Sequence, residues 1–321
     1  MTSDQSAPLL TGQSPQSEWT TARMPDLTAK TIVITGANSG IGLEAARAFA
    51  AHGAHIVLAV RTESKGYSAA ATIPGSTEVC HLNLADLVSV HRFAANWRGD
   101  IHALINNAGV LVPPFGLTSD GFELQFGTNH LGHFALTNLL LPYITGRVVT
   151  VASSQHYTAS IDFEDLNWTT RRYHRGQAYG QSKLANLLFT LELQRRLASS
   201  GSSVLAMAAH PGWASTNLGS MSYGRVMNAG ISVMNRVFAQ NAAAGATPTL
   251  FAATEPIAGG SYAGPGGRRG MAGPPTLVAR SRAASNPAVA ARLWAASEEL
   301  TGVSFPLRPN RTTNKSKGIR S

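Results

Sequence analysis

The glycine-rich turn at residues 35–42 is the feature of this sequence that most restricts its fold. It reads TGANSGIG and joins the apolar, β-branched segment Thr31–Thr35 to an alanine-rich segment with helical periodicity. Glycines in such a turn allow a tight bend, a close approach of the backbone to a pyrophosphate, and close packing of helix on strand. The spacing is G-x3-G-x-G, and its place between strand and helix predicts a dinucleotide-phosphate site at a helix N-terminus. Cofactor contacts are predicted for Gly36, Asn38, Ser39, Gly40, Ile41 and Gly42.

Apolar segments and segments with helical periodicity alternate along most of the chain. Strands are predicted at Thr31–Thr35, His55–Val60, Glu78–Asn83, Ile101–Asn106, Arg147–Ala152 and Ser203–His210, with a seventh candidate at Gly260–Gly264. Helices are predicted at Gly40–His52, Asp86–Trp97, Gly121–Leu141, Gln177–Ser199, Ala242–Thr254 and Pro287–Leu300. Such alternation is typical of a parallel sheet with both faces covered. We therefore predict an α/β fold, a doubly wound parallel sheet of the Rossmann type with about seven strands and helices on both faces.

The ends of the chain differ in composition from its middle. Residues 1–25 and 306–321 are polar, so we predict one folded domain over residues 26–305, a flexible N-terminal extension and a flexible basic tail. The formal net charge is +9, and the stretch from Arg268 to the end holds ten basic and two acidic residues. The basicity therefore belongs to the C-terminal part. We interpret it as a solvated tail in preference to a nucleic-acid-binding surface.

Cysteine content and hydropathy bear on location and on metal binding. The single cysteine, Cys80, excludes an intramolecular disulfide and a zinc site built from cysteines, and it favours a cytoplasmic protein. No run reaches the ~18 apolar residues of a membrane span, and the N-terminal residues lack a signal-peptide pattern, so we expect no membrane anchor. His130 and His133 are three residues apart, but no metal site is predicted there.

The end of the second predicted strand indicates which dinucleotide binds. An acid about 20 residues after the glycines would bind the ribose hydroxyls of NAD. Here Val60 is followed by Arg61, whose guanidinium suits a ribose 2′-phosphate, with Lys65 as a further cation. Glu63 is the nearest acid and the main argument for NAD. We predict NADP(H) as the cofactor.

Groups suited to proton transfer gather in the second half of the chain. Tyr179 and Lys183 are one helical turn apart, and an ammonium beside a phenol favours the phenolate and lowers its pKa. Ser153 follows the fifth predicted strand, where its hydroxyl can hydrogen-bond a substrate oxygen, since ligands of doubly wound sheets bind beyond the carboxyl ends of strands. The turns after the fourth and sixth strands, NNAG at 106–109 and PGWAST at 211–216, reach the same edge.

Together these motifs resemble those of the short-chain dehydrogenase/reductase family. The resemblance spans about residues 24–303 and is greatest to the branch with retinol dehydrogenases, WW-domain oxidoreductase and light-dependent protochlorophyllide reductase. It rests on TGANSGIG, NNAG, NHLGHF at 129–134, Tyr-x3-Lys and HPG-x3-T. The family's catalytic tetrad matches Asn129, Ser153, Tyr179 and Lys183. Its cofactor contacts match Asn107, Gly109, Tyr179, Lys183, Pro211, Gly212 and Thr216, and Asn83-Leu84 stands where the branch usually has Asp-Leu beside the adenine.

The resemblance implies an NADP(H)-dependent oxidoreductase that interconverts a carbonyl and an alcohol on a small, lipophilic substrate. Tyr179 would exchange the proton on oxygen and Ser153 would position that oxygen. Lys183 would lower the tyrosine pKa and hold the nicotinamide ribose, and Asn129 would steady a water chain behind the lysine. The cofactor would bring the redox chemistry, and the protein would bring orientation and electrostatics.

Two other functions stay open. A relative of protochlorophyllide reductase would reduce a C=C bond, and a non-catalytic dinucleotide-binding interaction protein would use the basic tail. His156, Trp213 and Met221 are candidates to line the substrate site. The helices predicted at Gly121–Leu141 and Gln177–Ser199 resemble the family's dimer faces, so a homodimer or homotetramer is expected.

Overall fold

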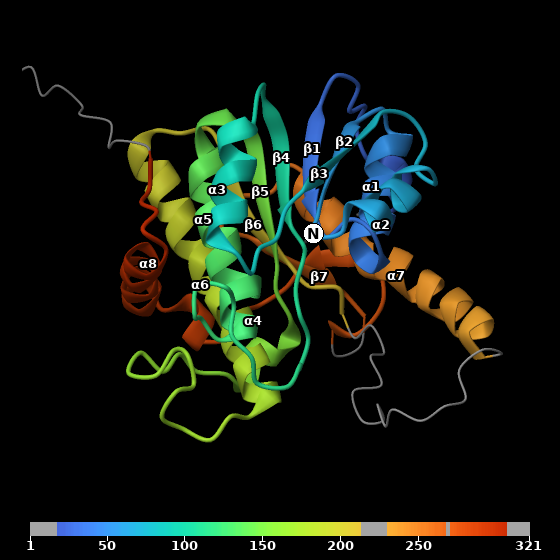
Figure 1. Cartoon of the computed structure of the whole chain (residues 1–321). Coiled ribbons are helices and arrows are strands. Elements are labelled where there is room, and N and C mark those ends of the chain that lie inside the picture. Colours follow the sequence, from blue (N-terminus) through green and yellow to red (C-terminus); the bar gives the residue numbers. More distant parts are fainter. Residues whose placement is uncertain (1–17, 213–229, 268–269, 307–321) are drawn as a thin grey trace, which may run out of the picture.

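Eight strands form one mostly parallel sheet in the computed structural model, which describes residues 18–212, 230–267 and 270–306. The strand order is β3-β2-β1-β4-β5-β6-β7-β8 (Figure 1). The strands are β1 (Thr31–Thr35), β2 (His55–Val60), β3 (Thr77–His81), β4 (Ile101–Asn106), β5 (Ile144–Val151), β6 (Leu205–Ala209), β7 (Tyr262–Pro265) and β8 (Pro275–Leu277). Pairing is parallel except between β7 and β8. The predicted fold class, a doubly wound α/β sheet, is confirmed.

The prediction of strands succeeded at the centre of the sheet and failed at one edge. β1, β2 and β4 have the predicted bounds, because their apolar residues are buried on both faces of the sheet. β8 was not predicted. It has three residues and begins at Pro275, and a proline, which lacks a backbone N–H, is a poor sign of a strand anywhere except at an edge. The sheet therefore has eight strands where about seven were expected.

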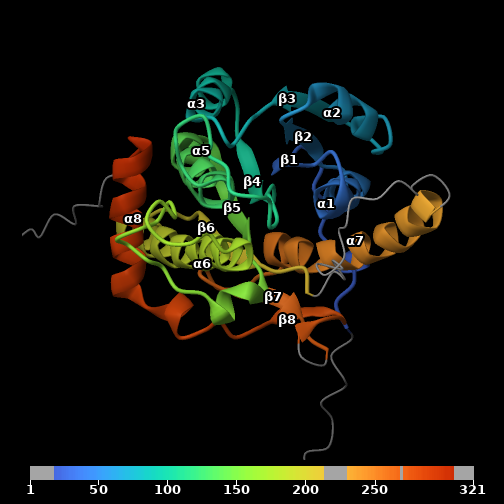
Figure 2. The same cartoon turned by 60° about the horizontal axis from the view of Figure 1, so that its bottom comes forward.

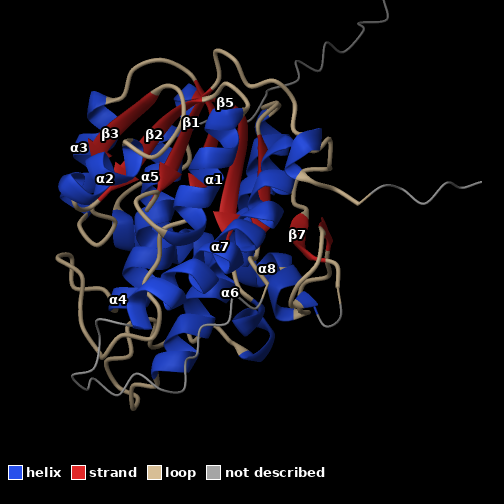
Figure 3. Ribbon diagram, turned by 90° about the vertical axis from the view of Figure 1, so that its right-hand side faces the viewer, coloured by secondary structure: helices blue, strands red, loops and turns tan. Residues whose placement is uncertain are grey.

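Helices cover both faces of the sheet. α1 (Gly40–Ala51) and α7 (Gly230–Thr254) lie on one face, in front of the strands in Figure 3. α3 (Leu87–Asn96), α5 (Gly132–Leu140) and α6 (Arg175–Ser200) lie on the other, to the left in Figure 1. The strands thus contribute to an apolar core on each side. α2 (Glu63–Ala70), which packs on β2 and β3, was not predicted because its sequence is mostly polar.

The helix predicted at Gly121–Leu141 is interrupted. α4 (Leu124–Phe126) leads into a π-helical turn at Gly127–Leu131, and α5 follows. A side chain at Gly132 would collide with the backbone oxygen of Leu84, so the helix packs closely on the loop after β3. Single π turns within helices are rare and often occur at functional sites. This one carries Asn129, a predicted tetrad residue.

The part of the chain that packs on the core begins before residue 26, where the folded domain was predicted to start. Trp19, Met24 and Leu27 are buried. Nε1 of Trp19 donates a hydrogen bond to Glu255 at 2.6 Å, and its ring meets Phe251 of α7 edge-on at 5.7 Å. The sequence missed this because these apolar residues are isolated among polar ones. The extension predicted over residues 1–25 therefore includes a docked part from about Trp19 onward.

α8 (Pro287–Thr301) packs across α6 and α5, the helices expected to form a dimer face (Figure 2). Trp294 is buried, stacks on Phe189 at 5.7 Å and meets Phe134 edge-on at 4.8 Å. The Arg196 guanidinium lies 4.5 Å from the Trp294 ring centre. α8 therefore covers the part of these helices around Phe134, Phe189 and Arg196. Oligomerisation through these helices stays an untested prediction.

Candidate active site

The glycine-rich turn lies at the carboxyl end of β1, next to the point where the strand order reverses between β1 and β4. Gly36 and Gly40 have φ angles of +67° and +57°, which favour glycine. No atom lies within 4 Å of the place where a Cβ at Gly40 would stand, so the backbone there faces open space. A Cβ at Gly42 would collide with the Asn107 side chain. This open backbone at the N-terminus of α1 fits a pyrophosphate.

The turn after β4 is tied directly to the end of β1. Oγ1 of Thr35 accepts hydrogen bonds from the N–H groups of Asn107 and Ala108, each at 2.9 Å. Nδ2 of Asn107 donates to the carbonyl oxygen of Thr35 at 2.8 Å. These bonds hold Gly109 and its neighbours beside the glycine-rich turn. Two segments that were predicted separately as cofactor contacts therefore share one edge of the sheet.

Three of the four predicted tetrad residues meet at the ends of β5 and α6. Ser153 follows β5 and caps the 3-10 turn at Ser154–Thr158. The Tyr179 hydroxyl is hydrogen-bonded with Ser153. Nζ of Lys183 donates to the carbonyl oxygen of Val151 at 3.0 Å and lies 5.6 Å from the centre of the Tyr179 ring. The phenol of Tyr179, the hydroxyl of Ser153 and the ammonium of Lys183 thus lie close together, so that one bound ligand could contact all three.

Asn129 links the tetrad to the turn after β4. Its Oδ1 accepts from the N–H of Val110 at 2.8 Å, and its Nδ2 donates to the Val110 carbonyl at 3.1 Å and to Ser182 Oγ at 2.9 Å. Its own carbonyl lies 3.0 Å from Nδ1 of His133. Because a carbonyl only accepts, His133 carries its proton on Nδ1, and its Nε2 accepts from the Thr35 hydroxyl at 2.9 Å. Asn129 is therefore held in one orientation.

Burial governs the protonation of the titratable tetrad residues. It raises the pKa of Tyr179, and the hydrogen bond with Ser153 offsets part of that rise. Burial also lowers the pKa of Lys183 to about 8. The prediction that Lys183 lowers the tyrosine pKa is wrong for this structure. Its ammonium is directed at the Val151 carbonyl, and desolvation of the phenol dominates.

A cavity of about 220 Å³ opens between these segments. Predicted residues on its wall are Ile41, Asn107, Gly109, Ser153, Tyr179, Lys183, Pro211 and Gly212. The wall also includes Val110, Leu111, Val151, Ala152, Ser154 and Gln155, which were not predicted. Val110 and Leu111 directly follow NNAG, and this pair of apolar residues was the signal that could have identified them. The wall is polar around the tetrad and apolar at residues 110–111.

His156 does not line the cavity, although it was a candidate substrate contact. It is fully buried, its Nδ1 donates to the Ser153 carbonyl at 2.7 Å, and its Nε2 accepts from the N–H of Ser281 at 3.2 Å. The physical reason for this correction is that both ring nitrogens are used to join the turn after β5 to the segment before α8. The other candidates, Trp213 and Met221, and the cofactor contact Thr216 lie outside the described residues.

The residues predicted on the adenosine side lie at the ends of β2 and β3. Arg61 is exposed directly after β2 and is accessible to a ligand. Oδ1 of Asn83 accepts from the N–H of Ala85 at 3.2 Å, so part of this amide is used within its own turn. Leu84 is buried and belongs mainly to the core. In the described residues, no three His, Cys, Asp or Glu side chains are grouped so that they could hold a metal ion.

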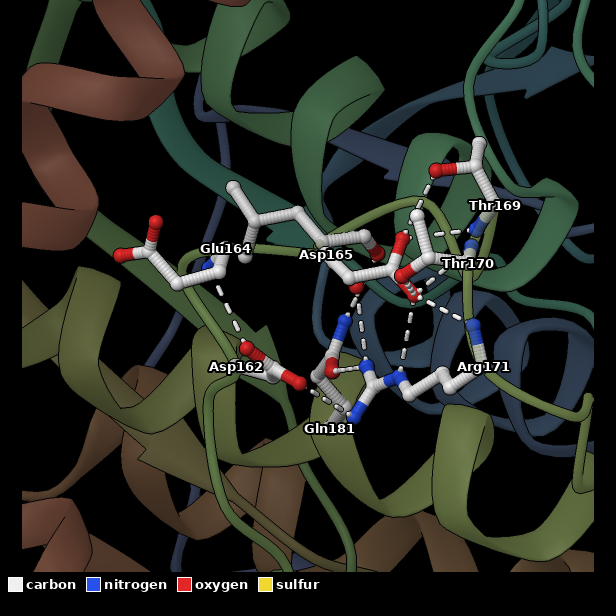
Figure 4. A network of polar contacts seen from close by, with 8 residues as sticks. Asp162, Glu164, Asp165, Thr169, Thr170, Arg171 and Gln181 are labelled. Carbon is white, nitrogen blue, oxygen red and sulfur yellow. Dashed lines mark hydrogen bonds and ion pairs between the residues drawn. The ribbon is translucent and has the colours of Figure 1, made fainter.

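A polar network stiffens the loop that precedes α6 (Figure 4). The Asp165 carboxylate accepts hydrogen bonds from the backbone N–H groups of residues 169–171 at 2.6–3.2 Å. Nη2 of Arg171 donates to Oε1 of Gln181 at 2.8 Å. Because Gln181 belongs to α6, the network fixes the loop to the helix that carries Tyr179.

Comparisons with known proteins agree with this geometry. The family model for short chain dehydrogenase matches residues 30–223, which contain the glycine-rich turn and all four tetrad residues. Retinol dehydrogenase 13 of Homo sapiens is 48% identical over 202 residues, 59% of this chain and 60% of that protein. A short-chain dehydrogenase/reductase of Armillaria gallica is 36% identical over 301 residues, 87% of this chain and 93% of that one. A crystal structure of an uncharacterized protein from Mycobacterium Paratuberculosis has a TM-score of 0.82 and 51% identity, covering 91% of this chain and all of that one.

The similarity to the retinol dehydrogenases is confined to part of each protein. The chain spans about 60% of the length of the retinol dehydrogenases it matches. In the ranges that the structure describes, no helix combines the length and the apolar character needed to cross a bilayer. The residues matched by the short chain dehydrogenase model contain β1 to β6, the glycine-rich turn and the tetrad, and they end before β7.

Proposed function

The chain belongs to the short-chain dehydrogenase family, and we propose that it is an NADP(H)-dependent oxidoreductase that interconverts a carbonyl and an alcohol. The meeting of Ser153, Tyr179 and Lys183 at a cavity that reaches the glycine-rich turn carries this proposal. A nicotinamide cofactor bound there supplies or accepts the hydride. The apolar wall at Val110 and Leu111 and the similarity to retinol dehydrogenases support a small, lipophilic substrate.

In this proposal the side chains of the site act on the substrate oxygen. The Tyr179 hydroxyl donates a proton to that oxygen during reduction and takes it back during oxidation. Its raised pKa keeps the phenol protonated at neutral pH, which suits donation. Ser153, hydrogen-bonded with Tyr179, positions the same oxygen. Lys183, whose Nζ lies 5.6 Å from the centre of the Tyr179 ring, holds the nicotinamide ribose.

Asn129 has a supporting part in the proposed reaction. Its Oδ1 and Nζ of Lys183 both flank the backbone of Gly109. Its amide keeps the segment after Gly109 in place through Val110. Asn129 thus holds the wall beside the ammonium, where a water chain behind Lys183 would run.

Turnover of a panel of aldehydes, ketones and alcohols tests the proposal. We expect oxidation of NADPH, followed by its absorbance, together with formation of the alcohol. Unsaturated ketones in the panel separate carbonyl reduction from C=C reduction, because the two products differ in structure. Dinucleotide binding without turnover of any compound would favour the non-catalytic interaction protein instead.

Cofactor preference is expected to depend on Arg61. This residue lies two positions after Ala59, which pairs with Thr35 at the start of the glycine-rich turn, and its side chain is exposed. We expect NADPH to bind more tightly than NADH and Arg61→Asp to reverse the order, because the change removes an attraction to the 2′-phosphate and adds repulsion. A charge-assisted contact of about 1.5–3 kcal/mol corresponds to roughly 10- to 150-fold in affinity. Fluorescence titration of both cofactors measures it.

Arg92→Asp is the matched control for this experiment. Arg92 is an exposed arginine of α3, so its replacement changes the net charge equally without touching the end of β2. We expect the order of the two cofactors to stay unchanged in this variant. Equal or tighter binding of NADH by the unaltered protein would contradict the assignment of NADP(H).

A further inference from the structure

The apolar wall of the cavity is a short segment whose backbone is held at two points. We call residues 110–112 the substrate lip. Val110 is bound through both its N–H and its carbonyl to the side chain of Asn129. The N–H of Val112 donates to Oε1 of Gln125 at 2.9 Å. Leu111, between these two anchors, lines the cavity and is 39% exposed. The anchors therefore decide where Leu111 stands.

The second anchor holds a strained residue. Val112 has a φ of +44°, and a β-branched side chain at positive φ is a genuine outlier. Pro113 follows it and restricts its backbone further. Conformations of this kind persist only where the surrounding structure holds them. Loss of the hydrogen bond from Val112 to Gln125 would thus let the lip relax to a different shape.

Gln125 joins the lip to the start of the helix that carries Tyr179. Its side chain is fully buried, and its Nε2 donates to the Tyr173 hydroxyl at 2.9 Å and to the carbonyl of Arg175 at 3.0 Å. Arg175 is the first residue of α6, and Tyr179 follows it by one turn. Both polar atoms of the Gln125 amide are therefore engaged, one toward the lip and one toward α6.

The support behind Gln125 is stiff. The Tyr173 hydroxyl donates to Glu123 at 2.8 Å, and the Tyr173 ring meets that of Trp168 edge-on at 5.6 Å. Trp168 is covered by the Arg171 guanidinium at 3.6 Å, and Arg171 is bonded to α6 through the network in Figure 4. Since this side is held by many contacts, the lip is the part that would move when Gln125 is replaced.

We propose that Gln125 is a positioning residue that sets the place of Leu111 over the cavity and thereby selects for long apolar substrates. Gln125 is not on the cavity wall, so it acts through Val112 and Leu111 without touching the substrate. This inference rests on the proposed carbonyl reductase function. It adds to that function a residue that determines which substrates are accepted.

Gln125→Leu tests the proposal, because it keeps the size of the side chain and removes both hydrogen-bonding groups. With NADPH and a series of straight-chain aldehydes, we expect kcat/KM for the longest members to fall about tenfold and for the shortest less than about threefold. NADPH affinity should stay unchanged. Hydrogen exchange at the Val112 amide should accelerate by at least about tenfold. Gln177→Leu is the matched control, since Gln177 is an exposed residue of the first turns of α6.

A rescue by Val112→Gly separates positioning from simple damage to the core. Glycine adopts a positive φ without strain, so the lip can keep its shape when the hydrogen bond is absent. We expect Gln125→Leu combined with Val112→Gly to recover most of the turnover of long aldehydes. General damage from a lost buried amide would not be repaired by a glycine at residue 112.

Four results would overturn the assignment, and one of them also concerns the reaction. An equal loss of kcat/KM for short and long aldehydes, or failure of Val112→Gly to restore turnover, would refute positioning by Gln125 while leaving the carbonyl reductase function intact. Unchanged hydrogen exchange at Val112 in Gln125→Leu would refute the anchor itself. No turnover of any carbonyl by the unaltered protein would overturn the proposed function and, with it, this role of Gln125.

Discussion

Tyr179→Phe is expected to lower kcat for carbonyl reduction by ~10²–10⁴-fold, the usual loss when a general acid is removed. The ring would still fill its place at the cavity wall, so the affinity for NADPH should change little. The raised pKa of Tyr179 means that the phenol stays protonated through the neutral range. The rate of reduction in the unaltered protein should therefore not fall from loss of this proton at neutral pH. Steady-state kinetics and a cofactor titration on the same preparation measure both effects.

Tyr67→Phe is the control for the tyrosine substitution. Tyr67 lies on α2, is 60% exposed and is far from the tetrad in sequence, so its loss should leave kcat unchanged. A Tyr179→Phe variant that retains more than about a tenth of the activity would be incompatible with proton donation by Tyr179. A large loss of NADPH affinity would show instead that the hydroxyl serves in cofactor binding.

Lys183→Met is expected to abolish turnover and yet to stabilise the fold at neutral pH. Burial lowers the pKa of Lys183 to about 8 from an ordinary 10.5, which corresponds to a cost of about 3 kcal/mol for folding with the amine protonated. Methionine removes this cost and has a similar length. The Val151 carbonyl would keep its hydrogen bond from Nδ2 of Asn186 at 3.1 Å, so no buried acceptor is left alone. We expect the free energy of unfolding at pH 7 to rise by about 1–3 kcal/mol.

The pH dependence of stability gives a second measurement of the same effect. The folded protein has the lower lysine pKa, so between about pH 8 and 10.5 the unfolded chain binds more protons than the folded one. The free energy of unfolding therefore rises as the pH rises through this window. Below pH 8 the protein bears the whole free-energy cost of burying the protonated Lys183 amine. Lys183→Met should remove this rise. Denaturant unfolding at several pH values measures it.

Lys30→Met provides the comparison for stability. Lys30 is exposed just before β1, and its replacement should change the free energy of unfolding by no more than about 0.5 kcal/mol. If Lys183→Met instead lost stability, the ammonium would be a net stabilising group through its hydrogen bond to Val151. Gain of stability with loss of activity would mark Lys183 as a residue kept for function.

Local sequence was sufficient for the central strands and for the residues that carry chemistry. β1, β2 and β4 were predicted with their observed bounds, because each is a short apolar run that ends in glycine, arginine or asparagine turns. The motif Tyr-x3-Lys places its two side chains one helical turn apart wherever the helix lies. The spacing of the glycines in the turn after β1 likewise determines, within a few residues, the open backbone that fits a pyrophosphate. In each case the information is contained within a few neighbouring residues.

Tertiary structure alone decided what those residues experience. The pKa of Tyr179 is raised by burial, which neighbours far away in the chain impose, and the hydrogen bond with Ser153 offsets only part of that rise. His156 is a buried link because Ser281, 125 residues later, approaches its ring. Gln125 became an anchor only because Val112, Tyr173 and Arg175 converge on it from separate segments. The sequence by itself thus determined the fold class and the set of chemical groups, since these follow from local pattern. Packing between distant segments decided the protonation of Tyr179 and Lys183, the shape of the substrate lip and the position of α8 on α6. Local sequence pattern does not encode such packing.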